Sequence, residues 1–333
     1  MSLIESPKAR FQPCMDSFLG ALSGILKALD DGRDMDELWG LSSLAFRTQI
    51  HRTLEPAGLF CRQWDQTYSK LLRRVGYDCI VGLRDQFYTS KDLRELQFAW
   101  MNTIEKALED ERPAIAFGLH GPAFGIIYGL DNDTEEYHVS TFMDDKKNEP
   151  INVQDVGSQL PPLIFVLIPT GKVAAFNPQE AVCEALKESV EHHLGLEKDE
   201  NGVHISAPPD LVAGPAAYNS WSSAIETGQV QPYWGASYYA AYYTEARSAA
   251  ATWLRRLAGL KEWHAEQNRL CSAAAHLENE VESFRRLPGL FPMNQPHALE
   301  EIARRTEASV CLRAARAEHI ACMELLAELK QYK

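Results

Sequence analysis

Cys14 is the residue whose type and position best suit a chemical role in this sequence. It directly precedes residues 15–30, where apolar residues recur at helical spacing. A thiol at the start of a helix lies near the positive end of the helix dipole and near unpaired backbone amides, which lower its pKa and can bind an oxyanion. Cys14 is therefore a candidate nucleophile. The alternative is a small buried residue at an ordinary helix start.

A nucleophilic thiol needs a base within hydrogen-bond reach, usually a histidine that an aspartate or asparagine orients. His120 lies in a loop with glycine and proline just before an expected strand, and His138 lies within the next strand. Asp144 and Asp145 directly follow that second strand and can orient an imidazole ring. His120 is the preferred base and His138 the second choice. The alternative for each histidine is an ordinary hydrogen-bonded or exposed side chain.

Tyrosines gather on one face of an expected helix over residues 235–257. The broad apolar arc of this helix holds Tyr238, Tyr239, Tyr242, Tyr243, Ala249, Ala250, Trp253 and Leu254, with Glu245 near its border. Buried tyrosine hydroxyls need hydrogen-bond partners. One interpretation is a polar-lined pocket that faces the Cys14 half of the chain, in which Tyr238, Tyr242 and Glu245 bind a cationic amine substrate.

The second interpretation of the same helix is structural. The hydroxyls would then bond to neighbouring backbone groups of a buried inter-domain helix. Glu245 would pair with an arginine inside the helical bundle, the candidates being Arg247, Arg255 and Arg313.

The elements that must position these residues change in character along the chain. Residues 1–171 mix helices with strands; helices are expected over 15–30, 35–41, 62–75 and 93–108, an extended piece over 46–52, and strands over 78–83, 114–118, 124–130, 137–142 and 163–168. The turn at residues 131–133 predicts a hairpin between two of these strands. Residues 172–333 read as helices throughout, over 178–194, 213–227, 235–257, 268–286 and 298–332. The sequence therefore predicts an α+β protein with domains 1–171 and 172–333.

Two further helix faces are assigned by their residue types. The last expected helix carries a seam of small residues that suits close packing on another helix: Ala303, Thr306, Val310, Ala314, Ala317 and Ala321. Glu180, Glu184, Glu188 and His192 recur every four residues on another helix, and the neighbouring lysines favour a solvated face over a metal site.

Composition and charge exclude several classes of function. The 333 residues include 46 acidic and 33 basic ones, a net charge of −13, which opposes binding to nucleic acid or to an anionic membrane. The longest aliphatic or aromatic run, residues 163–168, is far shorter than the ~20 residues that span a bilayer. Residues 1–10 lack the apolar core of a secretory signal. We therefore expect a cytoplasmic protein.

Metal and cofactor motifs are missing from the sequence. The seven cysteines are scattered without a CxxC pair, which argues against a disulfide framework and a structural zinc site. No HExxH motif, phosphate-binding loop or dinucleotide fingerprint is present. We expect neither a metal nor a cofactor.

Five short segments, taken in order, resemble the butirosin biosynthesis protein H-like family. They are CMDSFLG at 14–20, LWGLSSLAFR at 38–47, FGIIYGLD at 124–131, AYNSW at 217–221 and TEARSAA at 244–250. Proteins of this family have a papain-like, peptidase C39-like amino-terminal half and a helical carboxyl-terminal half. The resemblance covers nearly the whole chain.

The resemblance implies roles for particular residues. Cys14 would stand at the start of the central helix, packed against an antiparallel sheet whose strands carry a histidine and then an acidic residue. Asp144 fills the acidic position, but Ala123 stands where the histidine is expected, and His120 lies three residues upstream. This departure argues against peptidase chemistry.

Two functions from different classes follow. The first is a Cys14-dependent acyl or aminoacyl transferase, or an amidase, of secondary metabolism; the resemblance implies a carrier-protein thioester as acyl donor and a small-molecule amine as acceptor. The second is a papain-like scaffold that has lost catalysis and binds a small molecule or a partner protein. The sequence leaves the donor, the acceptor and the oligomeric state open, and a homodimer is compatible with it.

Overall fold

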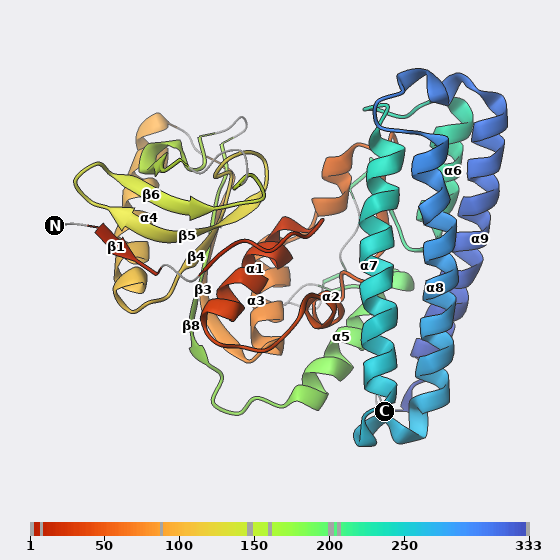
Figure 1. Cartoon of the computed structure of the whole chain (residues 1–333), viewed down its shortest axis with the longest axis horizontal. Coiled ribbons are helices and arrows are strands. Elements are labelled where there is room, and N and C mark those ends of the chain that lie inside the picture. The colour runs from red at the N-terminus through yellow and green to blue at the C-terminus, as the bar shows by residue number, and fades with distance from the viewer. Residues whose placement is uncertain are drawn as a thin grey trace. The chain divides into compact units, whose positions relative to one another are not determined.

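The computed structural model of the chain describes residues 3–6, 9–86, 89–144, 149–158, 162–198, 203–204 and 208–330. The chain divides into two compact units. The first comprises Met1–Leu38 and Gln63–Pro178, and the second comprises Trp39–Arg62 and Gln179–Lys333. The first unit holds an antiparallel sheet, and helices dominate the second (Figure 1). The predicted α+β class is confirmed.

The first unit is built on one mixed set of strands and helices. In chain order its elements are β1 (Leu3–Glu5), α1 (Ser17–Ala28), α3 (Trp64–Arg74), β3 (Tyr77–Arg84), α4 (Ser90–Glu109), β4 (Ala114–Phe117), β5 (Phe124–Asp131), β6 (Glu136–Ser140), β7 (Ile151–Asn152), the 3₁₀ turn η2 (Val153–Asp155) and β8 (Ile164–Lys172). Helix α2 (Met35–Leu41) crosses the boundary between the units. The seven strands follow the order β3-β8-β4-β5-β6-β7, with β1 paired to β5, and all pairs are antiparallel.

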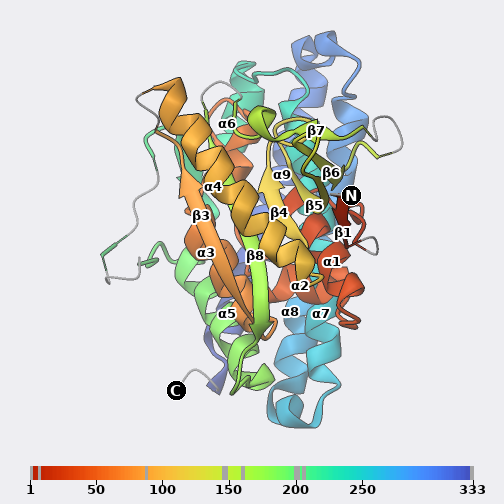
Figure 2. The same cartoon turned by 90° about the vertical axis from the view of Figure 1, so that its left-hand side faces the viewer.

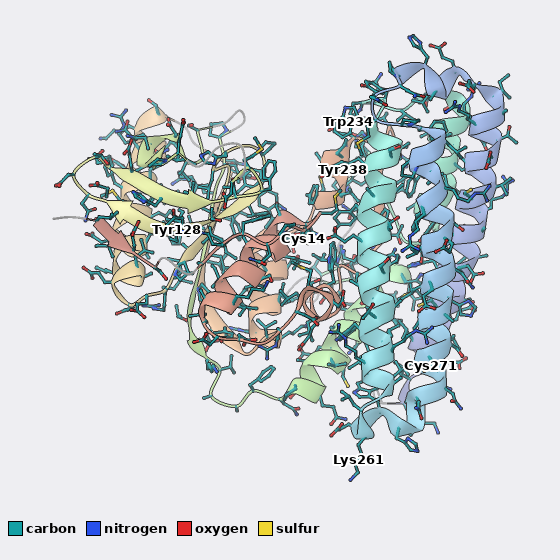
Figure 3. All side chains as sticks on the ribbon, in the orientation of Figure 1. Cys14, Tyr128, Trp234, Tyr238, Lys261 and Cys271 are labelled. Carbon is teal, nitrogen blue, oxygen red and sulfur yellow. The ribbon has the colours of Figure 1, made fainter. Side chains whose placement is uncertain are left out.

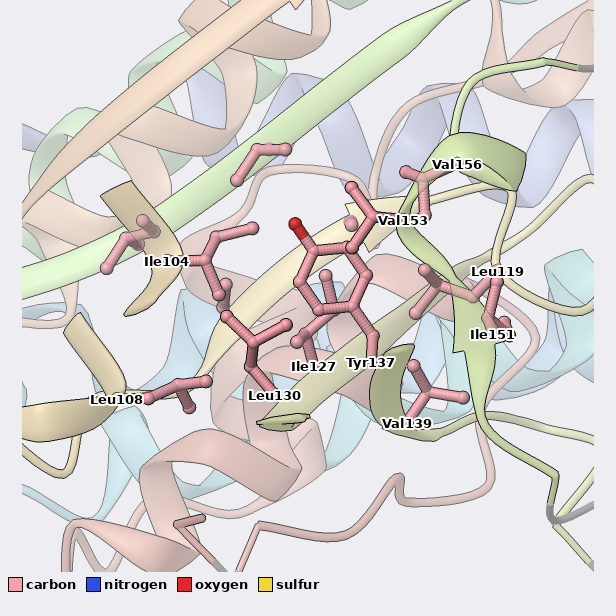
Figure 4. Close-up of a cluster of buried hydrophobic side chains, with 14 of the residues drawn as sticks. Ile104, Leu108, Leu119, Ile127, Leu130, Tyr137, Val139, Ile151, Val153 and Val156 are labelled. Atoms are coloured by element: carbon pink, nitrogen blue, oxygen red, sulfur yellow. The ribbon is translucent and has the colours of Figure 1, made fainter. Parts of the chain in front are cut away.

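Helices cover both faces of this sheet. Figure 2 shows α4 lying across the strands on one face. The apolar side of α4 packs into the cluster of buried residues drawn in Figure 4. On the other face, Phe18 of α1 stacks on Tyr68 of α3 at 3.5 Å between ring centroids. Both rings lie edge-on to Phe124 of β5, 5.4 Å away. These aromatic contacts hold α1 and α3 against this face of the sheet.

The predicted hairpin between β5 and β6 is confirmed. The two strands pair antiparallel, with Leu130 opposite Tyr137 and Asp131 opposite Glu136. In the turn, the Asp131 carboxylate accepts a hydrogen bond of 2.8 Å from the backbone amide of Asp133, as aspartate commonly does in tight turns.

The second unit is largely a helical bundle. Its elements are β2 (Gln49–His51), the 3₁₀ turn η1 (Pro56–Phe60), α5 (Pro178–His193), β9 (Leu211–Ala213), α6 (Pro215–Thr227), α7 (Gly235–Ala258), the turn η3 (Lys261–Glu266), α8 (Gln267–Leu290), the turn η4 (Pro296–Glu300) and α9 (Ile302–Ala327). Helix α8 packs between α7 and α9, α6 packs on α9, and β2 pairs antiparallel with β9. None of the helices in the described ranges is long and apolar enough to cross a bilayer.

The units differ in two segments from the division expected at residue 171, and one of these segments, residues 172–178, belongs to the first unit. Residues 39–62 belong to the second unit, although they precede most of the sheet in the sequence. Hydrogen bonds from α7 hold this segment: the Tyr243 hydroxyl donates to the carbonyl of Gln49, and the Tyr239 hydroxyl to that of Glu55.

The predicted seam on the last helix is wrong. The helix begins at Ile302, after a separate 3₁₀ turn, and ends at Ala327; residues 331 and 332 of the expected range lie outside the described part. The expected seam faces largely outward, and Val310 is 49% exposed. The buried face instead carries Ala308, Cys311, Leu312, Ala315, His319, Cys322, Met323 and Leu326. This face is the buried one because its larger side chains remove more apolar surface from water than the small residues of the expected seam would.

Candidate functional site

Cys14 lies just ahead of helix α1 rather than at its first turn. The helix begins at Ser17, and its N-cap is Asp16, a buried carboxylate that accepts from the amides of Phe18 (3.1 Å) and Leu19 (3.3 Å). Figure 3 shows Cys14 in the segment that leads into the helix. The expectation that first-turn amides are available to an oxyanion at Cys14 is therefore wrong for these two, because Asp16 already occupies them.

The start of α1 meets the start of strand β5. The amide of Phe124, the first residue of β5, donates a hydrogen bond of 3.0 Å to the hydroxyl of Ser17, the first residue of α1. Ala123 directly precedes this contact, half-buried, with its amide donating to the carbonyl of Gly121. Ala123, at the position where the resemblance implies a histidine, therefore lies next to the start of α1, and its side chain is only a methyl group.

Asp144 is held rigidly near the segment that carries Cys14. Its carboxylate accepts from the Ser140 hydroxyl at 2.5 Å and from the Thr141 amide at 2.6 Å. The same Ser140 hydroxyl oxygen accepts a hydrogen bond of 2.8 Å from the amide of Phe11, three residues before Cys14. One serine therefore connects the expected acidic residue to the segment of the expected nucleophile.

His120 reaches the same group of residues through Thr141. Its Nδ1 lies 3.4 Å from the Thr141 hydroxyl, and its Nε2 lies 3.1 Å from the carbonyl of Glu149. A carbonyl only accepts, so Nε2 carries the proton and the Nδ1 lone pair faces Thr141. The Thr141 hydroxyl also accepts from the amide of Met143 at 3.1 Å, which leaves its own proton for His120. His120 and Asp144 are therefore coupled through one threonine.

His138 has a different environment. It lies on β6 with its Nδ1 3.0 Å from the carboxylate of Glu5, and its ring is edge-on to Tyr128 at 6.2 Å. Arg10 in turn covers the face of Tyr128, 4.2 Å from the ring centre. These contacts bind β1 and the following segment to the sheet, so they support a structural role for His138. Asp145, the other acidic residue after β6, lies outside the described residues.

The three expected substrate-binding residues lie on α7 in the second unit. Tyr238 is half-buried and packs edge-on against Trp234, 5.6 Å away, near the start of the helix (Figure 3). Tyr242 is buried against Trp39 and Phe60 and lines a small surface pocket. Glu245 is half-buried. Cys14 belongs to the first unit, so the pocket that these residues are expected to share with it stays a prediction.

Two neighbouring tyrosines confirm the structural interpretation for their own hydroxyls. Tyr243 donates to the carbonyl of Gln49 at 2.6 Å and accepts from its amide at 2.8 Å. Tyr239 accepts from the amide of His51 at 2.9 Å, in addition to its bond to Glu55. The expected arginine candidates Arg247 and Arg255 pair with glutamates of α8, Glu280 and Glu278 respectively.

Arg247 lies at the centre of a buried polar network, and this network could not be predicted from the sequence. Its guanidinium is fully buried and donates to Glu280 (3.1 Å), to the Thr48 hydroxyl (2.6 Å) and to the carbonyls of Ala45 (2.5 Å) and Arg47 (3.1 Å). The network thus joins α7, α8 and the segment before β2.

Further members of the network bring histidines into the same buried region. The Tyr218 hydroxyl donates to Glu280, and the Nδ1 of His319 lies 3.4 Å from the second oxygen of that carboxylate. His192 accepts from the Thr48 amide through Nε2 (3.3 Å) and meets Glu197 through Nδ1 (2.8 Å). His192 is 2% exposed, so the solvated face expected for it is wrong.

Burial and charge shift the pKa of several network members. Burial lowers the pKa of His192 and of His319, and burial together with neighbouring His319 lowers the pKa of His193 to about 4. Burial alone would raise the pKa of Glu280, but the Arg247 charge, His319 and the Tyr218 hydrogen bond together outweigh it and hold this pKa below its usual range. The network therefore carries one buried ion pair and neutral histidines at neutral pH.

Neither a protein-family model nor a curated protein matches the sequence. Among the described residues, no group of three or more histidine, cysteine, aspartate or glutamate side chains is placed to hold a metal ion.

Sequence inspection missed Ser140, Thr141 and Glu280, which hold the charged residues in place. Glu280 had a detectable signal, because it falls on the buried stripe of α8 that includes Leu277 and Phe284. A glutamate on an apolar stripe needs a buried partner. Ser140 and Thr141 carried no such signal.

Proposed function

We propose that this protein is a cysteine-dependent acyl or aminoacyl transferase, related in chemistry to an amidase, whose first unit is papain-like. One observation carries the proposal: the Phe11–Ser140–Asp144 hydrogen bonds continue through Thr141 to His120. They connect the segment leading to Cys14 with a base and an acidic residue, the set of groups that an activated thiol requires.

The proposed reaction has two steps. The Cys14 thiolate attacks the carbonyl of a thioester, and the donor leaves as a thiolate, which forms an acyl-Cys14 thioester. An amine then attacks that carbonyl, His120 accepts the proton of the amine, and Cys14 leaves as a thiolate. The resemblance supports an acyl carrier protein as donor and a small-molecule amine as acceptor.

Ala123 and Asp16 favour transfer over peptide hydrolysis. A thioester already has a good leaving group, so its cleavage needs less help from a base than cleavage of a peptide bond does. A site with a methyl group at the expected histidine position, and with its helix amides bound by Asp16, retains enough for the easier reaction. His120 then serves chiefly in the second step, as acceptor of the amine proton.

Acyl transfer to Cys14 tests the proposal directly. The purified chain is incubated with an acetyl thioester of N-acetylcysteamine, and peptide mass spectrometry follows the acetyl group. We expect acetylation of the peptide that contains Cys14, and release of the group when a small amine is added. Cys14→Ala abolishes the modification, and Cys61→Ala, at an exposed cysteine, leaves it unchanged. Acetylation of Cys14 no faster than of Cys61 would contradict the proposal.

A second candidate function is a papain-like scaffold that binds a small molecule without catalysis. The observation that favours it is the engagement of both ring nitrogens of His120, by Thr141 and by the Glu149 carbonyl. A base in this arrangement must exchange one contact before it accepts a proton. This candidate predicts that no acetyl group is found on Cys14, either in the wild-type chain or in the His120→Ala variant.

A further inference from the structure

Strand β3 lies at one end of the sheet and has an open outer edge. It pairs with β8 along its inner side, from Tyr77 opposite Lys172 to Arg84 opposite Ile164. Its other side pairs with no strand in the part of the chain that the structure describes. Figure 2 shows this strand at the margin of the sheet, with α4 across one face. An edge of eight residues presents a row of backbone groups that another strand can pair with.

Several of the usual protections of an edge strand are missing from β3. Its sequence, YDCIVGLR, contains neither proline nor lysine. The irregularity in its pairing with β8 places the extra residue, Thr170, in β8 and leaves β3 regular. Ile80 is 45% exposed and Leu83 is 40% exposed. An exposed, regular and apolar edge strand is a site at which sheets join.

We propose that a second copy of this chain pairs with β3 in antiparallel orientation, with the two-fold axis at Val81. Opposite residues of antiparallel strands share a face, so this register places Asp78 of each copy opposite Arg84 of the other. Two ion pairs between the copies result, each joining one Asp78 to one Arg84. The two seven-stranded sheets then continue through the interface as one sheet.

The apolar residues of β3 match in the same register. Cys79 lies opposite Leu83, and Ile80 lies opposite Gly82. Trp100 of α4 covers Gly82 so closely that a Cβ atom there would lie 2.1 Å from the indole ring. The glycine lets the indole ring lie directly on the strand, and Ile80 of the second copy, opposite Gly82 on the same face, is placed to pack beside that ring.

Neighbouring registers lack this match. With the axis at Ile80, Arg84 lies opposite Gly76, and with the axis at Gly82, Asp78 lies opposite Gln86. Neither register pairs opposite charges. The charges therefore select the axis at Val81, and they also select a second copy over an unrelated strand, because the complementarity is of β3 with itself.

Light scattering after size-exclusion chromatography tests the dimer. We expect twice the mass of one chain at roughly 100 µM, and a shift to monomer on dilution. Asp78→Arg and Arg84→Asp each place like charges opposite one another, and each weakens the dimer about tenfold or more. The double variant Asp78→Arg/Arg84→Asp restores the pairing and the dimer. A wild-type chain that stays monomeric, or a double variant no better than the single ones, would overturn the proposal.

Cross-linking tests the register and does not depend on the charge variants. In a Cys61→Ser background, Val81→Cys brings two thiols face to face at the axis, and mild oxidation yields a disulfide-linked dimer. Asn102→Cys, at an exposed side chain on neighbouring α4, is the matched control. We expect the Val81→Cys dimer to form about tenfold faster or more than the control dimer. Equal rates would refute the pairing, and faster linkage through Ile80→Cys would refute the register.

Discussion

The two histidines near the end of β6 differ in what they contact. His120 connects through Thr141 to Asp144, whereas His138 pairs with Glu5 and holds the amino-terminal strand. A nearby carboxylate stabilises the charged form of a base that takes a proton from an attacking amine. Thr141 contacts both His120 and Asp144, so the two histidines are a matched pair for mutation.

His120→Ala is predicted to slow amine release of the acetyl group from Cys14 by about 10²–10⁴-fold, the usual contribution of a general base. His138→Ala is predicted to change this rate by less than about threefold, because its partner is a partly exposed carboxylate. Mass spectrometry of the acetylated peptide in samples quenched at successive times measures both rates. Equal losses in the two variants would show that His120 acts through stability alone.

Asp144 could be placed from the sequence, because an acidic residue directly after a strand lies at the end of a sheet. The bridging roles of Ser140 and Thr141 could not. Each depends on which backbone amide comes within reach after folding, and the Phe11 amide is far from Ser140 in the sequence. Short polar side chains carry no periodic signal for such contacts.

At the scale of elements, the start of α1 sets the charges in the segment next to Cys14. The Asp16 carboxylate caps this helix with two hydrogen bonds and places a negative charge between Cys14 and the positive end of the dipole. An anionic cap stabilises the helix, but it disfavours a nearby thiolate. Helix stability and thiol activation therefore compete at this one residue.

Asp16→Asn is predicted to raise the rate of Cys14 alkylation by iodoacetamide near pH 7 several-fold. Asparagine also accepts from the helix amides, so the melting temperature should change little. Asp16→Ala removes the cap as well and is expected to destabilise the fold by about 1 kcal/mol. Peptide mass spectrometry gives the rate, with Cys79, whose pKa burial raises to about 11, as an internal reference. A slower reaction of Cys14 in Asp16→Asn would contradict this account.

Helices and strands with strong periodicity could be predicted, and contacts between them could not. The tyrosine helix was expected over 235–257 and extends from Gly235 to Ala258, and the short helix Met35–Leu41 has the expected bounds. Strands β1 and β9, of three residues each, were missed because they are too short for alternation to show. The seam of the last helix was misplaced because small residues suit exposed positions as well as tight contacts.

At the scale of the whole chain, one buried ion pair joins segments that lie far apart in the sequence. Arg247 and Glu280 are both fully buried, and Arg247 also holds the carbonyl groups of Ala45 and Arg47. Removing one partner of such a pair leaves an uncompensated charge in the core. Replacing both partners by apolar residues avoids that cost.

Arg247→Met is predicted to destabilise the protein by about 3–5 kcal/mol, the usual cost of leaving a buried charge unpaired. The double variant Arg247→Met/Glu280→Met is predicted to recover much of this loss. Arg255→Met, which removes one partner of the exposed pair with Glu278, should cost about 0–1 kcal/mol. Urea unfolding followed by circular dichroism measures all three. A double variant as unstable as Arg247→Met would show that the hydrogen bonds to the two carbonyls matter more than the charge.

The buried histidines make the second unit sensitive to acid. His193 has a pKa of about 4 in the folded chain, lowered by burial and by His319, against an ordinary value of 6.5. Above pH 6.5 both folded and unfolded chains hold it neutral. Between pH 6.5 and 4 only the unfolded chain binds the proton, so stability falls as the pH falls through this range. Glu197, with a pKa held at about 2 by His192 and Arg47 against the effect of burial, adds a further loss below pH 4.5.

His193→Gln is predicted to remove part of this acid sensitivity. Glutamine binds no proton in either state, so the loss of stability between pH 7 and pH 5 should shrink by about 1–2 kcal/mol, after allowance for solvent screening at a half-buried site. His297→Gln is the control, because that side chain is 86% exposed. Denaturant unfolding at the two pH values compares each variant with the wild type at the same pH, which removes any constant effect of the substitution. If both variants keep the full wild-type loss, the proton is taken up elsewhere, and His192 and His319 become the remaining candidates within the network, because burial lowers the pKa of both.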